Sequence, residues 1–343
     1  MKQLLNTLFV MTEGSYLRLE HETVRVELDG ATKLQVPLHH LGGLVLFGNV
    51  MTTPFLLHKC AEDGRSVVLL DRNGRYRCRM VGKTGGNVFL RHQQHLAIED
   101  DERQVPVVRN LVAGKLQNTR QVLLRGQREA KIDDDATALK SAADLLGRAI
   151  ERLPGATDVD FMRGLEGESA RVYFDCLDRM ITQNREAFRM SGRSRRPPRD
   201  RINALLSFLY VMLLNDCISA VEGVGLDPQM GFLHVMRPGR PSLGLDLMEE
   251  LRPILADRLA LTLVNLRQIG PEDFEERPGG AVYLNEKGRK TVVAAYQKRK
   301  QDDVQHPVLE QSVPFGLIPH LQARLLARHL RGETEAYTPF LYR

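Results

Sequence analysis

The side chains best suited to chemistry begin with a glutamate in a helical segment. In residues 159–180, helical spacing places Glu166 on the same stripe as Met162 and Tyr173. A carboxylate that faces a protein core is costly unless it is paired or bound to a metal. Periodicity leaves two interpretations open: a buried ion pair with an arginine such as Arg163, or a metal ligand.

Glycines flank this glutamate on both sides. Gly164 and Gly167 each cost roughly 1 kcal/mol of helix propensity relative to alanine. Glycines inside a helix are easier to explain where another backbone or a bulky ligand approaches closely. The sequence therefore predicts a close approach to this part of the helix.

A histidine and three acids form the second chemical group. His234 precedes an Arg-Pro-Gly-Arg-Pro turn, and Asp246, Glu249 and Glu250 lie on one side of the helix expected after that turn. The simple interpretation is a capping histidine, with acids that complement the dipole at the helix N-terminus. The alternative is a site for Mg²⁺ or Mn²⁺, the oxygen-preferring ions of phosphoryl transfer. Helical angles do not settle which acids take part and slightly favour Asp246 with Glu250.

Two basic stretches predict a surface that binds phosphate. Residues 189–201 carry six arginines against one aspartate, and their glycine and two prolines indicate a loop. Residues 287–300 carry six basic residues and no acid at helical spacing. The alternative for the first stretch is a solvated linker, and the alternative for the second is a polar helix face. The presence of both stretches in one domain favours binding to nucleic acid. The candidate DNA-binding residues are Arg193, Arg195, Arg196, Arg199, Lys287, Arg289 and Lys290.

Composition is that of an ordinary globular protein. The 343 residues are 43% hydrophobic and 27% charged, a length that suggests two domains. A net charge of +5 mildly favours a polyanionic partner. The four cysteines form no CxxC pair and fit a reducing cytoplasm. The apolar run 204–214 is too short to span a bilayer and predicts a buried core helix, so we expect no membrane association.

Pattern divides the chain into a β part and a helical part. The first 80 or so residues hold short alternating runs separated by turn signals, among them Asn73-Gly74, which favours a type I′ hairpin. One helix interrupts them, with Thr53 as its N-cap and Gly64 at its C-terminal end. Helical periodicity follows, over 88–98, 105–131, 135–152, 159–185, 201–222, 243–268, 287–303 and 315–331.

These patterns predict an α+β protein. A small N-terminal β-sandwich-like domain spans residues 1–82, and residues 83–87 form a linker. A larger all-α catalytic domain spans residues 88–343. Every candidate metal ligand lies in the second domain, so the first is free to serve another purpose.

Four stretches together resemble the CRISPR-associated adaptation integrase family, the first of the two adaptation proteins of CRISPR systems. The resemblance covers nearly the whole chain, and the motifs occur in the order of the family. The closing EAYTPFLYR is most similar to the type I-C branch. The four stretches are RGLEGESARVYF (163–174), RPPRDRINALLSFLYVML (196–213), GFLHVMRPGRPSLGLDLMEELRP (231–253) and QKRKQDDVQHP (297–307).

The resemblance implies a Mg²⁺ or Mn²⁺ site made of one glutamate, one histidine and one further acid. Glu166 matches the first and His234 the second. Glu249 matches the third, at a position that is often aspartate in the family. Asp246 matches an acidic position next to the metal. Asn203 matches a recurrent asparagine, whose side chain we expect to order the start of the apolar helix.

The resemblance also implies an activity and partners. The expected enzyme is a metal-dependent DNA endonuclease and integrase that inserts short captured duplexes at the CRISPR repeat, by attack of a 3′-hydroxyl on a phosphodiester. Its expected partners are double-stranded DNA, a second copy bound through the β domains, and the small second adaptation protein in a heterohexamer. Two rivals stay open: a general metal-dependent nuclease on branched or single-stranded DNA, and a non-catalytic DNA-binding scaffold.

Overall fold

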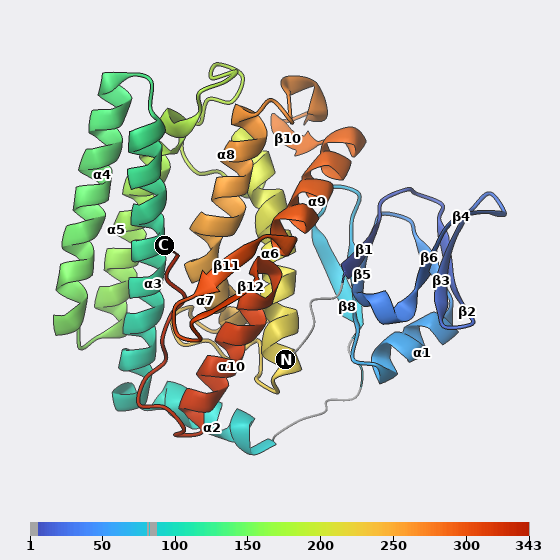
Figure 1. The fold of residues 1–343 in the computed structure, drawn as a ribbon, viewed down its shortest axis with the longest axis horizontal. Coiled ribbons are helices and arrows are strands. Elements are labelled where there is room, and N and C mark those ends of the chain that lie inside the picture. The colour runs from blue at the N-terminus through green and yellow to red at the C-terminus, as the bar shows by residue number, and fades with distance from the viewer. Residues whose placement is uncertain (1–5, 81, 83–87, 343) are drawn as a thin grey trace. The chain divides into compact units, whose positions relative to one another are not determined.

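The computed structural model describes residues 6–80, 82 and 88–342, which form two compact units (Figure 1). The first unit holds residues 1–85 together with 284–298, and the second holds 86–283 and 299–343. The predicted linker 83–87 lies outside the described residues. Residues 284–298 group with the N-terminal strands, although their pattern places them in the predicted C-terminal domain. A grouping between distant parts of the chain leaves no mark on local periodicity.

Two four-stranded sheets, the helix α1 and most of the helix α9 (Glu286–Gln301) build the first unit. The sheets have the orders β1-β5-β7-β8 and β4-β3-β2-β6. Leucine and valine side chains of both sheets form one buried cluster with Leu56 and Cys60 of α1, which confirms a β-sandwich-like core. The elements are β1 (Asn6–Val10), β2 (Tyr16–Glu20), β3 (Thr23–Leu28), β4 (Ala31–Pro37), β5 (Leu41–Phe47), β6 (Met51–Thr52), α1 (Pro54–Glu62), β7 (Ser66–Leu70) and β8 (Tyr76–Met80).

The structure has the predicted caps of α1 but not the turn type predicted after β7. The Thr53 side chain accepts a hydrogen bond from the backbone N–H of Leu56, and Gly64 has a φ of +67°, as predicted for this helix. The type I′ prediction at Asn73-Gly74 is wrong, because only Gly74 has positive φ. Asp71 accepts the N–H of Gly74 (2.9 Å) and donates its own N–H to the carbonyl of Arg75 (2.8 Å). This longer turn, with glycine at its left-handed position, suits a register irregularity in the β7–β8 pair.

Long helices dominate the second unit. α3 packs against α4, α5 and α7, and α6 packs against α7 and α10 (Figure 1). α6 is long and apolar enough to cross a membrane, but 61% of its most apolar window is buried inside the protein, as expected of the predicted core helix. The helices are α2 (Val88–Glu99), α3 (Asp101–Glu129), α4 (Asp133–Arg152), α5 (Val159–Cys176), α6 (Arg201–Gly223), α7 (Ser242–Leu251), α8 (Arg258–Asn265) and α10 (Ile318–Leu330). α9 (Glu286–Gln301) belongs to the first unit up to residue 298.

The prediction of an all-α second domain is wrong in detail, since the domain is only mostly helical. Two antiparallel hairpins interrupt it, β9 (Phe274–Arg277) with β10 (Ala281–Leu284) and β11 (Asp303–His306) with β12 (Gln311–Pro314). Each of these strands has four residues, which is too short for an alternating pattern to stand out.

The predicted helix 243–268 is interrupted by a wider turn. A π-helical segment, Arg252–Asp257, separates α7 from α8. Pro253 supplies the physical cause, because a proline inside a helix has no N–H to donate to the carbonyl four residues earlier, here that of Glu249. Single π-turns inside helices often accompany functional sites, and this one begins three residues after a candidate metal ligand.

Candidate active site

His234 lies on a loop without regular secondary structure, which the surrounding helices hold in place. Gln94 of α2 is fully buried and donates to the backbone carbonyl of Met230 (2.7 Å). Arg163 of α5 donates to the carbonyl of Leu233 (2.6 Å). Buried backbone groups need such partners. The side chains of neighbouring helices therefore take the place of a strand or helix in fixing this loop.

Asp246 of α7 is the strongest anchor of the same loop. Its Oδ2 accepts the N–H groups of Phe232 (2.6 Å) and Leu233 (3.0 Å). Its Oδ1 accepts the backbone N–H of His234 (2.9 Å) and lies 2.6 Å from His234 Nδ1. With a proton on Nδ1 donated to this carboxylate, Nε2 carries the free lone pair. Asp246 is fully buried, and both of its oxygens already accept hydrogen bonds from the loop. Its carboxylate therefore orients the histidine.

Two further acids converge on one lysine. The Lys115 ammonium, on α3, contacts Glu166 Oε1 of α5 and lies 2.6 Å from Glu249 Oε2 of α7. Arg252 lies 3.0 Å from the same oxygen of Glu249. Two carboxylates from different helices thus share two cations, which is the balance of charge that a buried cluster requires.

The charges around Glu249 favour its ionised form. Burial by itself raises the pKa of this carboxyl, but Arg252, Lys115 and His234 together hold the pKa below its usual value. Glu249 is therefore an anion ready to bind a cation.

Glu250, the next residue, faces away from this cluster. Its carboxyl accepts hydrogen bonds from the Tyr337 hydroxyl, from the N–H of Phe340 (2.5 Å) and from the Gln322 side chain (3.2 Å). Burial raises the pKa of Glu250 to about 7, against the lowering effect of these donors. Glu250 thus holds the C-terminal segment and belongs to the structural side of α7.

A protein-family model described as CRISPR associated protein Cas1 matches residues 8–298. The chain belongs to the Cas1 family. It is 58% identical to CRISPR-associated endonuclease Cas1 1 of Moorella thermoacetica, over 99% of both chains. It is also 50% identical to CRISPR-associated endonuclease Cas1 2 of Rhodospirillum rubrum, over 100% of both chains.

Solved structures agree with this Cas1 assignment in fold. A Cas1 protein of Thermotoga maritima superposes with a TM-score of 0.82 at 25% identity, covering 97% of this chain and 99% of the other. A casposase bound to an integration product superposes with a TM-score of 0.83 at 20% identity, covering 97% of this chain and 93% of the other. The β-rich first part and mostly helical second part are therefore the Cas1 architecture.

Nucleases of this kind generally need a metal ion, and the donors of this Cas1 chain suit one in part. Within residues 6–80, 82 and 88–342, no three histidine, cysteine or acidic side chains stand together in a metal-binding geometry. However, Glu249 Oε2 is buried, and its contacts are with two cations, Lys115 at 2.6 Å and Arg252 at 3.0 Å. A buried carboxylate oxygen paired with a second carboxylate is the donor set that hard divalent ions prefer. Glu166, Glu249 and His234 Nε2 are the groups that would hold the ion.

The glycines beside Glu166 are exposed to open space. A Cβ placed on Gly164 or Gly167 would meet no atom within 4 Å. The predicted close approach therefore does not come from the described backbone of this chain, and the expectation of a bulky ligand remains.

Asn203 orders the start of α6, as predicted. Its amide donates to Asp200 Oδ2 (2.6 Å) and to the Gly192 carbonyl (2.8 Å), and its oxygen accepts from Arg193 (2.6 Å). The Arg193 guanidinium also lies over the rings of Phe174 and Tyr210 at 5.7 and 5.2 Å. This arginine, a candidate DNA contact, is committed to the protein interior.

The other candidate DNA contacts differ in their surroundings. Arg195 and Arg196 are exposed on the 189–201 loop. Arg199 is exposed and donates to the carbonyl of Gly279. On α9, Arg289 donates to the carbonyl of Leu284 (2.7 Å) and Lys290 pairs with Glu286 (2.6 Å), while Lys287 is exposed.

Lys115 and Arg252 are the charged residues that sequence reasoning missed. Lys115 follows Leu111 by four residues and precedes Asn118 by three, so it lies on the buried stripe of α3. A lysine on an apolar stripe signals a buried anionic partner, and that signal was present in the sequence.

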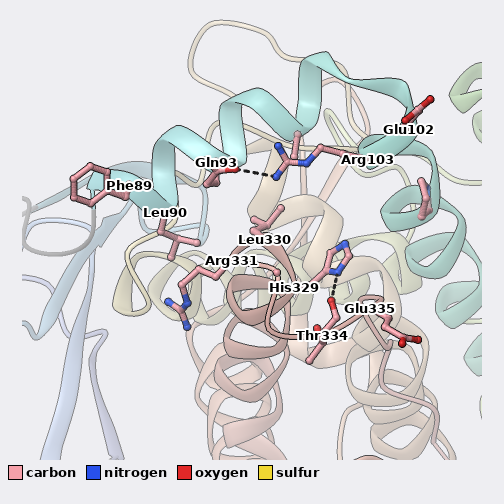
Figure 2. Close-up of a pocket in the computed structure, with 13 residues that line it drawn as sticks. Phe89, Leu90, Gln93, Glu102, Arg103, His329, Leu330, Arg331, Thr334 and Glu335 are labelled. Atoms are coloured by element: carbon pink, nitrogen blue, oxygen red, sulfur yellow. Dashed lines mark hydrogen bonds between the residues drawn. The ribbon is translucent and has the colours of Figure 1, made fainter.

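A cavity elsewhere in the second unit takes no part in this site. It has a volume of about 770 Å³ and lies between α2, the start of α3 and the end of α10 (Figure 2). Phe89, Arg103 and Arg331 are among its lining residues, and none of the candidate ligands is. Figure 2 shows Gln93 and Arg103 joined by a hydrogen bond on its α2 side (3.2 Å).

Proposed function

We propose that this chain is the integrase of CRISPR adaptation, which inserts short captured DNA duplexes as new spacers in antiviral defence. The convergence of Glu166 and Glu249 on the Lys115 ammonium carries this proposal, together with the hydrogen bond by which Asp246 orients the His234 ring. The likeness to a CRISPR-associated endonuclease over 99% of both chains supports nuclease chemistry, and the resemblance of the motifs to the adaptation integrase family implies DNA as the substrate.

Integration is a transesterification in which a 3′-hydroxyl attacks a phosphodiester at the repeat boundary. The new P–O bond forms as the bond to the 3′ oxygen of the cut repeat strand breaks, and that oxygen leaves with a proton. A Mg²⁺ or Mn²⁺ ion held by Glu166, His234 and Glu249 would supply Lewis-acid polarisation of the phosphoryl group. Asp246 fixes the His234 ring with Nε2 outward. Arg252, held over the rings of Phe174 and Tyr210 (5.5 and 5.4 Å), keeps Glu249 ionised and in place.

The proposal extends to DNA and protein partners. Exposed arginines of the 189–201 loop and the basic residues of α9 would hold duplex phosphates without reading bases. The β-rich unit would form a homodimer, and two such dimers would flank a dimer of the small second adaptation protein in a heterohexamer. We further propose that the chain is of the type I-C branch, because of its closing EAYTPFLYR, and that it acts in the cytoplasm.

An integration assay tests the activity directly. A labelled duplex and a supercoiled CRISPR plasmid are incubated with the chain and the second adaptation protein, with and without Mn²⁺. We expect joined product only with the ion, and none from Glu166→Ala or His234→Ala, while both variants keep their fold and most of their DNA binding. Asp144→Ala, which removes a partly exposed carboxylate paired with Lys140 on α4, is the matched control and should join normally.

The outcome also separates the rivals. Cleavage of branched or single-stranded DNA without any joining would favour a general nuclease, with water in place of the 3′-hydroxyl. DNA binding with neither reaction would favour a scaffold. Joining at the wild-type rate by Glu166→Ala or His234→Ala would remove this active site from consideration.

A further inference from the structure

A buried lysine occupies the middle of the proposed metal site. Lys115 is 2% exposed, and lysines are almost never buried without a paired anion. Among the described residues, its ammonium contacts the carboxylates of Glu166 and Glu249 and no other charged group. These are the same oxygen atoms that a divalent ion at this site would need.

We propose that Lys115 is an internal cation that occupies the carboxylate pair in the metal-free enzyme and is displaced from it when the divalent ion binds. The inference rests on the proposed function, since it takes the ion to bind at Glu166 and Glu249. It assigns Lys115 as a positioning residue, which keeps the two ligands together before the ion arrives.

The contacts indicate which of the two cations leaves. Arg252 is 4% exposed, lies over two aromatic rings and begins the π-turn, so its planar group is held in one geometry. Lys115 ends in a compact ammonium on a flexible four-carbon stem, and its two charge contacts are both with the proposed ligands. An incoming ion repels both cations, but only the ammonium lies between the two carboxylates.

The lysine also explains how the site can form without metal. Glu166 and Glu249 come from different helices, α5 and α7, and both pack against α3, which carries Lys115. Without a cation between them, two ionised carboxylates would repel each other. The ammonium removes that repulsion, and every ion that binds must first replace it.

Calorimetric titration of Mn²⁺ into the full chain tests the exchange. Lys115→Met keeps the length of the side chain and removes the charge. We expect this variant to bind Mn²⁺ at least about tenfold more tightly than the wild type does. That gain corresponds to about 90% of metal-free wild-type molecules holding the lysine bridge. Metal-free Lys115→Met should melt at a lower temperature than the wild type, and Mn²⁺ should raise its melting temperature further than it raises that of the wild type. Lys140→Met, which removes an exposed lysine paired with Asp144 on α4, should change neither quantity.

A second measurement serves if Lys115→Met does not fold. Acylation of lysines in the wild-type chain, read by mass spectrometry, should leave Lys115 protected without ion and modify it faster with Mn²⁺ present. Lys140 should react equally in both conditions. Protection of Lys115 that is unchanged by saturating Mn²⁺ would overturn the exchange.

The outcomes distinguish this inference from the proposed function. If the wild type binds Mn²⁺ and Lys115→Met binds it with equal or weaker affinity, the exchange is overturned but the proposed function is not. A wild-type chain that joins DNA but binds no Mn²⁺ overturns the proposed metal site and the exchange with it.

Discussion

Three acidic residues within one short helix have three different surroundings. Asp246 accepts hydrogen bonds from the loop that carries His234, Glu249 pairs with Lys115 and Arg252, and Glu250 holds the C-terminal segment. Their residue types and spacing are nearly equivalent, so the partners decide what each carboxylate does. These partners support Glu249 as the third ligand and Asp246 as the group that orients the histidine.

Asp246→Asn is expected to impair joining through the loop and leave metal affinity less changed. The amide replaces one acceptor oxygen with a donor that faces backbone N–H groups, which should lower the free energy of unfolding by about 2 kcal/mol. Chemical denaturation measures that loss, and calorimetry measures Mn²⁺ affinity. Glu249→Gln is the comparison and should lose Mn²⁺ affinity and joining together. Loss of the ion by Asp246→Asn alone would reverse the two assignments.

At the scale of elements, the C-terminal segment 337–342 fixes two helices of the site. The amide of Asn118, on α3, donates to the carbonyls of Glu250 and Phe340 (2.7 Å each). A Cβ on Gly114 would lie 2.6 Å from Pro339, so the segment passes directly over the residue before Lys115. The helices that carry Lys115 and Glu249 are thus held at the residues next to those side chains.

Phe340→Ala tests this segment. The ring is fully buried against Phe315 and His306, and its removal should lower the free energy of unfolding by about 3–5 kcal/mol. We expect weaker Mn²⁺ binding as well, because α3 and α7 lose a shared contact. Phe161→Ala, at a half-exposed ring on α5, is the control and should change both far less. If Phe340→Ala is destabilised but binds Mn²⁺ as tightly as the wild type does, the segment stabilises the fold without affecting the metal site.

At the scale of the molecule, DNA binding depends less on the net charge than on which arginine side chains are exposed to solvent. The double variant Arg195→Ala/Arg196→Ala should bind DNA of every sequence more weakly, and by a similar factor. The slope of log affinity against log salt concentration should become shallower by about 0.9 for each lost phosphate contact. Arg193→Ala should instead lower thermal stability, because its guanidinium is bound to Asn203 and two aromatic rings. Binding isotherms at several salt concentrations and melting curves separate the two effects. An unchanged salt slope in the double variant would make this loop a solvated linker.

The proposed homodimer depends on the β-rich unit. β4 is an edge strand whose first five residues are exposed, among them Leu34 at 44%. An exposed edge is a template for pairing with a second chain. Leu34→Glu should therefore weaken dimerisation by about tenfold or more, or about 1.4 kcal/mol, measured by light scattering across a dilution series. Ile132→Glu, equally apolar and 52% exposed in the second unit, should leave it unchanged. A Leu34→Glu chain that dimerises normally would place the interface elsewhere.

The sequence by itself determined what local patterns control. Alternation and helical periodicity predicted the strands of the first unit and the helices of the second, since burial of one face repeats along a strand or helix. The capping role of Thr53 could be predicted locally because its partner, the N–H of Leu56, lies three residues away. The role of Asn203 was implied by the family resemblance, and its side chain bonds Asp200 and Gly192 in the adjoining loop. Glu166, His234 and Glu249 were reached through family motifs, because periodicity alone could not separate Glu249 from its neighbours.

The tertiary structure decided everything that depends on distant partners. Lys115, Glu166 and Glu249 lie on three helices, and only packing of α5 and α7 on α3 brings their charges together. Arg193 was read as a surface charge because nothing near it in sequence reveals the rings of Phe174 and Tyr210. Contacts between residues far apart in the chain leave no periodic trace, so the identity of each acid's partner had to come from the fold.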